Sequence, residues 1–517
     1  MKDFYRSEGS LMDIGSYLFQ SASKYPNKVA IYYEDRKYTY REFNEEVNMF
    51  AHGIRSLGLA KGDKVAIMMK NSDRFAFAFF AAAKLGAVIV PINTRLTSSE
   101  LHYMLEQSDS VLVICDASFE TTIAEAAQNT NVQNVIVSGS AIHAGFYSYD
   151  AVRTSIVEEP AIKVSELDDL EILYTSGTTG RPKGALFDHN RIFKVGITMI
   201  VGLGLNHHDR LLHLAPLFHS AQLNLFFITG VVLGATHYIH SDFDPVKTLK
   251  AIDEHRISLF FGVPAMYNMM LQVPNKLDYD LSSVQRCAYG AAPMAPEVVK
   301  RSMELFQTDQ FYNLCGLTEA GPGGIILDPD GHKHHFGKGG KPFFITEARV
   351  VTANGEDIQP GAVGEFVLRG DTIMKEYYKK PAETLEAIKD SWLYTGDLAT
   401  IDEEGFISLV DRKKDMVISG GENVYSIEVE EVLYEHPHIL EAAIIGIPDE
   451  VWGEAVCAVI VPKGDQVIDE QELRSFCRKK LAGYKVPRRI FIEQQLPRNA
   501  SGKVLKYQLR QGLTNQK

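Results

Sequence analysis

The sequence is poor in cysteine, and its cysteines do not follow the spacing of a disulfide framework or a zinc site. They are isolated from one another, and no CxxC pair or histidine cluster accompanies them: Cys115, Cys287, Cys315, Cys457 and Cys477. Isolated cysteines in an odd number are typical of free thiols in a reducing compartment. We therefore expect neither a zinc protein nor a disulfide-stapled secreted domain.

The sequence also lacks a long run of basic residues. Its formal net charge is −13, which argues against a nucleic-acid partner, although a local basic patch at a phosphate site stays compatible. No apolar segment follows the charged N-terminus Met1–Arg6, so we expect no signal peptide.

No apolar run is long enough for a membrane span, which needs about 20 residues with few charges. The most hydrophobic stretch, 75–92, is interrupted by Lys84 and carries two breakers, Gly86 and Pro91. This pattern favours a helix over 74–85 that ends at the glycine and leads into a buried strand. We expect a cytoplasmic protein with no membrane span.

At 517 residues the chain is too long for a single core, and its pattern changes along its length. Strands and helices alternate up to about residue 346, which predicts an α/β fold with mostly parallel sheets. Short alternating segments from Glu347 predict a small antiparallel barrel or sheet. A charge run, Asp411–Asp415, precedes a small α+β unit, so we place the boundary between domains 1–411 and 412–517 there.

The stretch Tyr174–Gly184 is the most informative part of the sequence. It follows an apolar strand and combines glycines, hydroxyl groups and cations, as a loop that holds a polyphosphate requires. A flexible linker is the plain alternative, but linkers rarely follow an apolar strand this closely. The stretch does not fit the common P-loop pattern. The candidate nucleotide-binding residues are Thr175, Ser176, Gly177, Thr178, Thr179, Gly180 and Lys183.

Further motifs follow in order: Gly316-Leu-Thr-Glu319, Tyr394-Thr-Gly-Asp397, Asp411-Arg412 and, near the end, Lys503. With the glycine-rich loop they resemble the adenylate-forming superfamily of acyl- and aryl-CoA synthetases, luciferases and peptide-synthetase adenylation domains. The resemblance covers roughly residues 10–510 and is strongest to medium- and long-chain fatty acyl-CoA ligases.

The resemblance implies a fold and a reaction. The fold is a large N-terminal domain of layered αβαβα sheets plus a small β-barrel, followed by a small mobile α+β domain. The cofactors are ATP, Mg²⁺ and CoA. A carboxylate attacks the α-phosphorus of ATP to give an acyl-adenylate and pyrophosphate, and the CoA thiol then displaces AMP.

The resemblance also assigns roles in the two half-reactions. Glu319 would hold Mg²⁺, and Thr318 would bind a phosphate oxygen. Asp397 would accept from both ribose hydroxyls, and Arg412 would contact the ribose or a phosphate. Lys503 would be the catalytic lysine that draws carboxylate and α-phosphate together. The plain alternatives are an exposed glutamate, a turn-capping aspartate, a solvated linker and a surface lysine.

Small residues are expected where adenine lies: Gly290, Ala291 and Ala292, with Gly316 nearby. Many relatives carry an aromatic residue just before the Gly-x-Thr-Glu turn, and here that residue is Cys315. The residue that stacks on adenine therefore stays open.

Three positions around the small domain complete the assignment. Lys414 matches the hinge about which the small domain swings. Gly420 and Gly421 would line the pantetheine tunnel, where a side chain would obstruct the passage. Ser426 is expected to cap the following helix.

The segment Ala215–Ser220 matches one beside the acyl pocket, with His219 at its polar position. Phe218, Gly262 and Val263 are further pocket candidates. No aspartate stands nearby to pair a substrate ammonium, which argues against amino acids. Open alternatives are an aryl-acid CoA ligase of the 4-coumarate, benzoate or succinylbenzoate type, an enzyme that loads a carrier protein, and a catalytically dead binder. The oligomeric state, a homodimer included, is also open.

Overall fold

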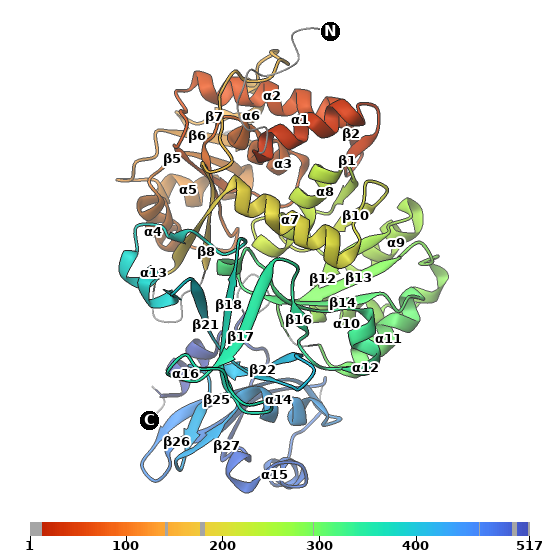
Figure 1. Ribbon diagram of the computed structural model, residues 1–517, viewed down its shortest axis with the longest axis vertical. Helices are drawn as coiled ribbons and strands as arrows, with labels where there is room; N and C mark the ends of the chain where they lie inside the picture. Colours follow the sequence, from red (N-terminus) through yellow and green to blue (C-terminus); the bar gives the residue numbers. More distant parts are fainter. Residues whose placement is uncertain are drawn as a thin grey trace. The chain divides into compact units, whose positions relative to one another are not determined.

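The structure is a computed structural model that describes residues 13–139, 143–175, 181–292, 294–464, 466–498 and 504–514. It confirms the α/β class (Figure 1). The chain forms two compact units. The first comprises residues 1–334, 342–347 and 368–393, and the second comprises 335–341, 348–367 and 394–517. The hinge expected at 411–414 stays a prediction.

A nine-stranded sheet carries most of the candidate acyl and adenine residues. Its order is β16-β15-β14-β13-β12-β10-β11-β1-β2. The strands from β1 to β14 along this path pair in parallel, whereas β2 is antiparallel to β1 and β15 is antiparallel to β14. The bounds are β1 (Val29–Tyr33), β2 (Arg36–Thr39), β10 (Arg210–His213), β11 (Thr236–Ile239), β12 (Leu259–Gly262), β13 (Arg286–Gly290), β14 (Phe311–Gly316), β15 (Gly324–Leu327) and β16 (Lys341–Pro342).

An eight-stranded sheet carries the two ends of the glycine-rich stretch. Its order is β19-β9-β8-β4-β3-β5-β6-β7, and Thr175 at the end of β8 pairs with Lys183 at the start of β9. The bounds are β3 (Lys64–Met68), β4 (Val88–Pro91), β5 (Ser110–Asp116), β6 (Asn134–Ser138), β7 (Tyr147–Ser148), β8 (Asp169–Thr175), β9 (Lys183–Asp188) and β19 (Glu376–Tyr377).

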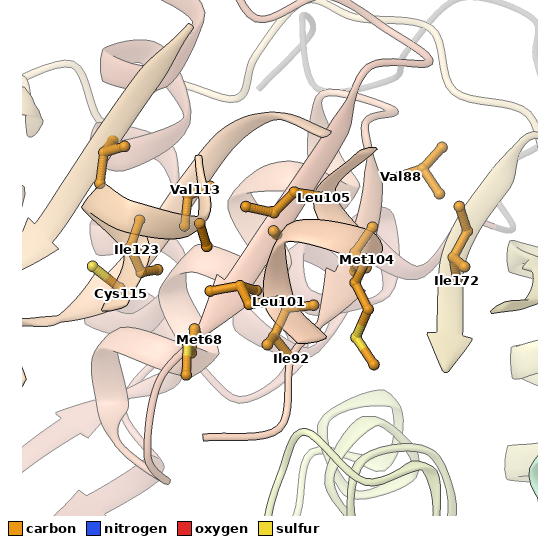
Figure 2. Close-up of a cluster of buried hydrophobic side chains, with 14 of the residues drawn as sticks. Met68, Val88, Ile92, Leu101, Met104, Leu105, Val113, Cys115, Ile123 and Ile172 are labelled. Atoms are coloured by element: carbon orange, nitrogen blue, oxygen red, sulfur yellow. The ribbon is translucent and has the colours of Figure 1, made fainter. Parts of the chain in front are cut away.

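Figure 2 shows the core between this sheet and two helices, α4 (Ser98–Ser108) and α5 (Glu120–Ala126). Leu101, Met104 and Leu105 of α4 recur at helical spacing and are buried, which packs one face of the helix on the strands. The Glu100 carboxylate accepts the N–H of Thr97 at 2.9 Å, and this capping box fixes where α4 begins.

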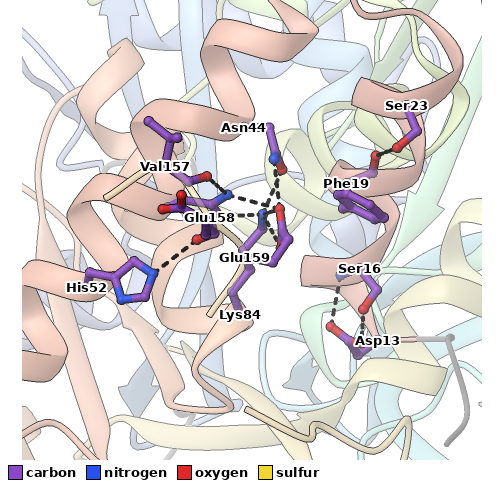
Figure 3. Close-up of polar contacts among 11 residues, drawn as sticks. Asp13, Ser16, Phe19, Ser23, Asn44, His52, Lys84, Val157, Glu158 and Glu159 are labelled. Carbon is purple, nitrogen blue, oxygen red and sulfur yellow. Dashed lines mark hydrogen bonds and ion pairs between the residues drawn. The ribbon is translucent and has the colours of Figure 1, made fainter. Parts of the chain in front are cut away.

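The hydrophobic stretch around Lys84 forms a buried helix, α3 (Asp73–Lys84), followed by β4. The Lys84 ammonium lies within 2.6–2.8 Å of the side-chain oxygens of Asn44, Asn48 and Glu159 (Figure 3). A buried charge needs such partners. None of the helices in the described ranges is long and apolar enough to cross a membrane.

The other helices of the first unit cover its sheets. Their bounds are α1 (Ile14–Lys24), α2 (Tyr40–Ser56), α6 (Tyr149–Val152), α7 (His189–Leu203), a π-helix (Ala221–Ile228), α8 (Thr229–Leu233), α9 (Pro245–His255), α10 (Pro264–Gln272), α11 (Pro296–Phe306), α12 (Pro329–His334) and α13 (Pro381–Ala387).

Two five-stranded sheets follow. The first has the order β17-β18-β21-β20, with β22 paired to β21, and the second has the order β24-β23-β26-β25, with β27 paired to β26. Helices α14 (Ser426–Tyr434), α15 (Glu470–Arg478) and α16 (Lys506–Thr514) accompany the second sheet. The strand bounds are β17 (Thr346–Val351), β18 (Gly364–Gly370), β20 (Ile388–Lys389), β21 (Trp392–Ile401), β22 (Ile407–Arg412), β23 (Val417–Ser419), β24 (Glu422–Val424), β25 (Ile439–Asp449), β26 (Gly453–Pro462) and β27 (Arg489–Ile492).

The expected capping role of Ser426 is wrong. Tyr425 is the N-cap of α14, and Ser426 is the first helical residue. Asp411 supplies the acceptor instead: its carboxylate accepts the backbone N–H of Ser426 and, at 2.9 Å, its hydroxyl. A carboxylate distant in sequence therefore does what the local serine was expected to do.

Candidate active site

Glu319 lies where three segments of the first unit meet. It belongs to a short 3₁₀ turn (Thr318–Ala320) directly after β14. Its Oε1 atom accepts hydrogen bonds from Thr175 Oγ1 at 3.1 Å and from the Tyr377 hydroxyl at 2.8 Å. Within the described ranges, Oε2 of Glu319 has no hydrogen-bond partner. One oxygen is thus fixed by the protein and the other is available to a ligand.

Tyr377 is a site residue that the sequence did not reveal. It lies on β19, opposite Ala185 of β9, and the Lys183 ammonium lies 4.3 Å from the centroid of its ring. Burial, and after it the negative charge of Glu319, raise the pKa of the Tyr377 hydroxyl. The hydroxyl therefore stays protonated and acts as a donor to Glu319. The pairing of β19 with β9 brings Tyr377 to the site, and this pairing joins segments far apart in the sequence, so no local pattern marks Tyr377.

Thr318 points toward the segment expected beside the acyl pocket. Its hydroxyl lies 3.3 Å from the Ser220 hydroxyl. The neighbouring His219 accepts the Ala221 N–H on Nδ1 at 3.3 Å, and burial lowers its pKa. His219 is therefore a neutral imidazole whose Nε2 carries the proton. Phe218 beside it is half-buried.

Asn71 holds this segment in place. Its side-chain N–H donates to the Ala215 carbonyl at 2.9 Å, and its oxygen accepts the Leu217 N–H at 2.6 Å. The side chain is buried, so both bonds form away from water and are costly to lose. Asn71 follows β3 and gives no motif that would mark it.

The small residues expected at adenine lie at the end of β13: Gly290 is its last residue, and Ala291 and Ala292 follow it. A Cβ atom on Gly290 would lie 2.2 Å from the Leu314 carbonyl oxygen, so only glycine fits beside β14. Ala291 has φ +67°, a left-handed conformation that costs a non-glycine residue about 1–2 kcal/mol. Such strain is common at ligand sites, and Ala292 next to it is exposed.

The remaining pocket candidates end neighbouring strands. Gly262 is the last residue of β12, and Val263 is the N-cap of α10. A Cβ on Gly262 would lie 3.2 Å from the Tyr267 ring. Gly316 is the exposed last residue of β14, and Cys315 before it is half-buried opposite Ile325.

The second unit brings Asp397 and Arg412 together. They face each other across β21 and β22, and Arg412 Nε lies 3.0 Å from Asp397 Oδ1. Arg412 thus ends a strand and does not lie in a solvated linker. The backbone N–H of Asp397 donates to Thr395 Oγ1 at 3.1 Å. The ion pair orients the Asp397 carboxylate and the Arg412 guanidinium before any ligand binds.

Lys414 is exposed between two anchored aspartates. Asp411 binds Ser426 as described, and Asp415 binds Arg510 of α16 at 2.7 Å. Further on, Gly420 (φ +64°) and Gly421 (φ +84°) adopt left-handed conformations. The Trp452 ring occupies the space that a Gly420 side chain would need, at 2.8 Å.

Several predicted residues lie outside the described residues: Ser176, Gly177, Thr178, Thr179, Gly180 and Lys503. In the part of the chain that the structure describes, no group of three or more acidic, histidine or cysteine side chains forms a metal cluster. A metal at Glu319 would therefore take most of its ligands from elsewhere, as Mg²⁺ does when it bridges one carboxylate and phosphate oxygens.

Comparisons with known proteins agree with this geometry. Residues 18–378 match the AMP-binding enzyme family, and residues 428–503 match the AMP-binding enzyme C-terminal domain. The chain is 37% identical over 498 residues to a feruloyl-CoA synthase of Amycolatopsis sp, covering 96% of this chain and 98% of the relative.

Two further comparisons point to different acids. The chain is 36% identical over 514 residues to the long-chain-fatty-acid–CoA ligase FadD13 of Mycobacterium tuberculosis, covering 97% of this chain and 98% of that one. The crystal structure of the anthranilate CoA ligase AuaEII in complex with anthranoyl-AMP superposes with a TM-score of 0.89 at 27% identity, covering 97% of each chain.

Proposed function

Because the chain belongs to the AMP-binding enzyme family, we propose that it is an AMP-forming acid–CoA ligase whose acid is a medium- or long-chain fatty acid. It activates the acid as acyl-AMP with release of pyrophosphate and then transfers the acyl group to CoA with release of AMP. The observation that carries the proposal is the convergence of Thr175, Glu319 and Tyr377 beside Lys183.

In the first half-reaction the residues around Glu319 would hold Mg²⁺ and ATP. The fit rests on Glu319 itself, since one of its oxygens is fixed by two donors and the other is unpartnered among the described residues. Bound Mg²⁺ neutralises charge on the phosphate oxygens. Thr318 offers a hydroxyl to the phosphates, and Lys183 adds positive charge. Asp397 and Arg412 would hold the ribose.

Lys503 and His219 complete our assignment of the first half-reaction. Lys503 would neutralise the charge that grows at the α-phosphate as the carboxylate attacks. His219 offers a neutral N–H donor, which can orient the substrate carboxylate by a hydrogen bond without forming an ion pair with it.

For the second half-reaction we propose that the small domain turns about Lys414. A hinge residue must absorb a backbone rotation, and an exposed side chain between two fixed aspartates meets that need. Gly420 and Gly421 would then line the passage for the pantetheine arm. We further propose that the enzyme works in the cytoplasm, and a homodimer is our proposal for its assembly.

An aryl acid is the second candidate. The 37% identity to a feruloyl-CoA synthase favours it as directly as the 36% identity to FadD13 favours a fatty acid. Gly262 and Gly290 would leave room in the pocket for either an alkyl chain or a flat ring.

A panel of acids tests the proposal. CoA-dependent AMP release would be measured with fatty acids of increasing chain length and with benzoate, 4-coumarate, ferulate and succinylbenzoate. A smooth optimum among the fatty acids is expected. A sharp preference for one aromatic acid would transfer the enzyme to the aryl branch, and turnover with none of the acids would contradict the ligase proposal.

A further inference from the structure

The π-helix (Ala221–Ile228) directly follows the segment expected beside the acyl pocket. π-Helices are rare, mostly span a single turn and often occur at functional sites. This one is hydrogen-bonded to the segment at two places. Gln222 Oε1 accepts the Ala215 N–H at 3.3 Å, and the Leu223 N–H donates to the His219 carbonyl at 3.1 Å. The position of the π-helix therefore influences the position of His219.

Asn224 of the π-helix is hydrogen-bonded to a side chain of the eight-stranded sheet. Its Nδ2 atom donates to Glu171 Oε1 at 2.7 Å, and Glu171 lies on β8, the strand that leads into the glycine-rich stretch. Both residues are 0% exposed. The register partners of Glu171 on β4 and β9 are Ile89 and Phe187, which are buried and apolar. The hydrogen bond thus joins the π-helix to β8 inside the core.

Each of these two side chains has a second oxygen that is buried and has no hydrogen-bond partner among the described residues. These atoms are Glu171 Oε2 and Asn224 Oδ1. An ionised carboxylate and an amide oxygen only accept hydrogen bonds, so the two cannot bind each other while Glu171 is ionised. A proton on Glu171 Oε2 can be donated to Asn224 Oδ1, while the Asn224 N–H still donates to Glu171 Oε1. One proton then satisfies both oxygens.

No cation balances Glu171 in the part of the chain that the structure describes. Burial raises its pKa, the Asn224 hydrogen bond lowers it, and no charged residue contributes. The titratable groups hydrogen-bonded to the π-helix are His213, which binds Gln222, and through it His237. Burial lowers the pKa of both imidazoles, so they are neutral. A buried carboxylate without a cation is costly, and the core therefore favours the neutral form of Glu171.

We propose that Glu171 and Asn224 form a neutral acid–amide pair with two hydrogen bonds, and that this pair positions the π-helix, and with it His219, for binding of the substrate acid. The positioning role rests on the proposed function, since it concerns how the ligase binds its acid. Glu171 and Asn224 act through the helix and are positioning residues. When Glu171 loses its proton, the hydrogen bond to Asn224 Oδ1 is lost and the helix loses this support.

Infrared difference spectroscopy of the full chain tests the acid–amide pair without any substrate. The spectrum of Glu171→Gln is subtracted from that of the unaltered protein at pH 7 and at pH 9.5. The C=O band of a protonated carboxylic acid should appear in the difference at pH 7 and be replaced by a carboxylate band at pH 9.5. A carboxylate band at pH 7 would overturn the proposal, because an ionised Glu171 can form only one of the two hydrogen bonds with Asn224.

The pH dependence of the KM for the substrate acid tests the positioning role, in acid-dependent exchange of pyrophosphate into ATP. Burial raises the pKa of Glu171 to about 8. If only the protonated pair binds the substrate acid, its KM should rise about tenfold from pH 7 to pH 9. Glu171→Gln should keep the KM of pH 7 throughout, because its amide can form the same two hydrogen bonds with Asn224. Equal pH profiles of this KM in both proteins would overturn the positioning role.

Asn224→Leu removes the pair, and Glu171→Gln is its matched control because it keeps both hydrogen bonds. At pH 7, Asn224→Leu should raise the KM for the substrate acid about tenfold or more and leave the KM for ATP unchanged. An equal rise in both KM values would mean that the pair supports the sheet as a whole, and would overturn the positioning role. If Asn224→Leu does not fold, the pH profile of Glu171→Gln decides.

Failure of the pair and failure of the proposed function give different results. Exchange that depends on an acid, without the protonated band at pH 7, would overturn the pair and leave the ligase proposal standing. The protonated band without exchange for any acid would contradict the ligase proposal, and the positioning role with it, but would confirm the protonated Glu171.

Discussion

Tyr377→Phe removes one hydrogen bond from Glu319 and changes little else. The phenol donates to Glu319 Oε1 at 2.8 Å, and the side chain is 5% exposed. A buried hydrogen bond to a charged group contributes about 1.5–3 kcal/mol. If that bond orients the carboxylate for Mg²⁺, kcat/KM for ATP should fall by roughly 10- to 100-fold. The Mg²⁺ concentration needed for half-maximal rate should rise as well.

Tyr378→Phe is the matched control. Its hydroxyl also donates to a carboxylate, that of Asp109 at 3.1 Å, but Asp109 is no part of the candidate site. The assay is acid-dependent exchange of pyrophosphate into ATP at varied ATP and Mg²⁺. We expect Tyr378→Phe to leave both dependences unchanged. Equal behaviour of the two variants would refute the role given to Tyr377, and a change in the KM for the acid alone would move that role to the acyl pocket.

Three further predictions follow from other parts of the chain. Lys84→Met should destabilise the protein by about 3–5 kcal/mol, because the Lys84 side chain is 1% exposed and its loss leaves the Glu159 carboxylate without its cation. The control Lys61→Met breaks the ion pair with Asp168, but the Lys61 side chain is 42% exposed, so it should cost at most about 1 kcal/mol. Equal shifts of the two variants in urea unfolding would be inconsistent with burial as the cause. Burial raises the pKa of Glu171 from 4.5 to about 8, so the folded state holds a proton that the unfolded state releases, and its contribution to stability is complete below pH 4.5 and is lost as the pH rises through 8. Glu171→Gln removes this pH dependence, so in thermal unfolding the variant should become more stable relative to the unaltered protein as the pH rises from 4.5 to 8. A parallel pH profile in both proteins would disprove the assignment. Lys503→Ala should lose adenylate formation but still convert a pre-made acyl-adenylate with CoA, and equal loss in both half-reactions would remove the role given to Lys503.

Local patterns predicted individual elements closely. The helix expected over 74–85 is α3 (Asp73–Lys84). It could be predicted because apolar runs and a helix-ending glycine act within a few residues of the chain. The same holds for β8, whose apolar run leads directly into the glycine-rich stretch.

Long-range partners could not be predicted. Tyr377 reaches Glu319 only because β19 pairs with β9, and Asn71 holds a segment 144 residues away. Asp411 takes the capping role expected of Ser426, since a carboxylate delivered by β22 competes successfully with a local hydroxyl. The ion pair of Lys84 with Glu159 was predictable only in part (Figure 3). Lys84 stands out because it interrupts an apolar run, but nothing near it in the sequence points to Glu159.

The ratio of AMP, pyrophosphate and acyl-CoA formed in one reaction tests the central claim most directly. The full chain would be incubated with ATP, Mg²⁺, the preferred acid and CoA, and AMP, pyrophosphate and acyl-CoA would be quantified together. The account predicts equal amounts of all three and, without CoA, pyrophosphate exchange that still depends on the acid. Adenylate formation with no acyl-CoA product at any CoA concentration would contradict it.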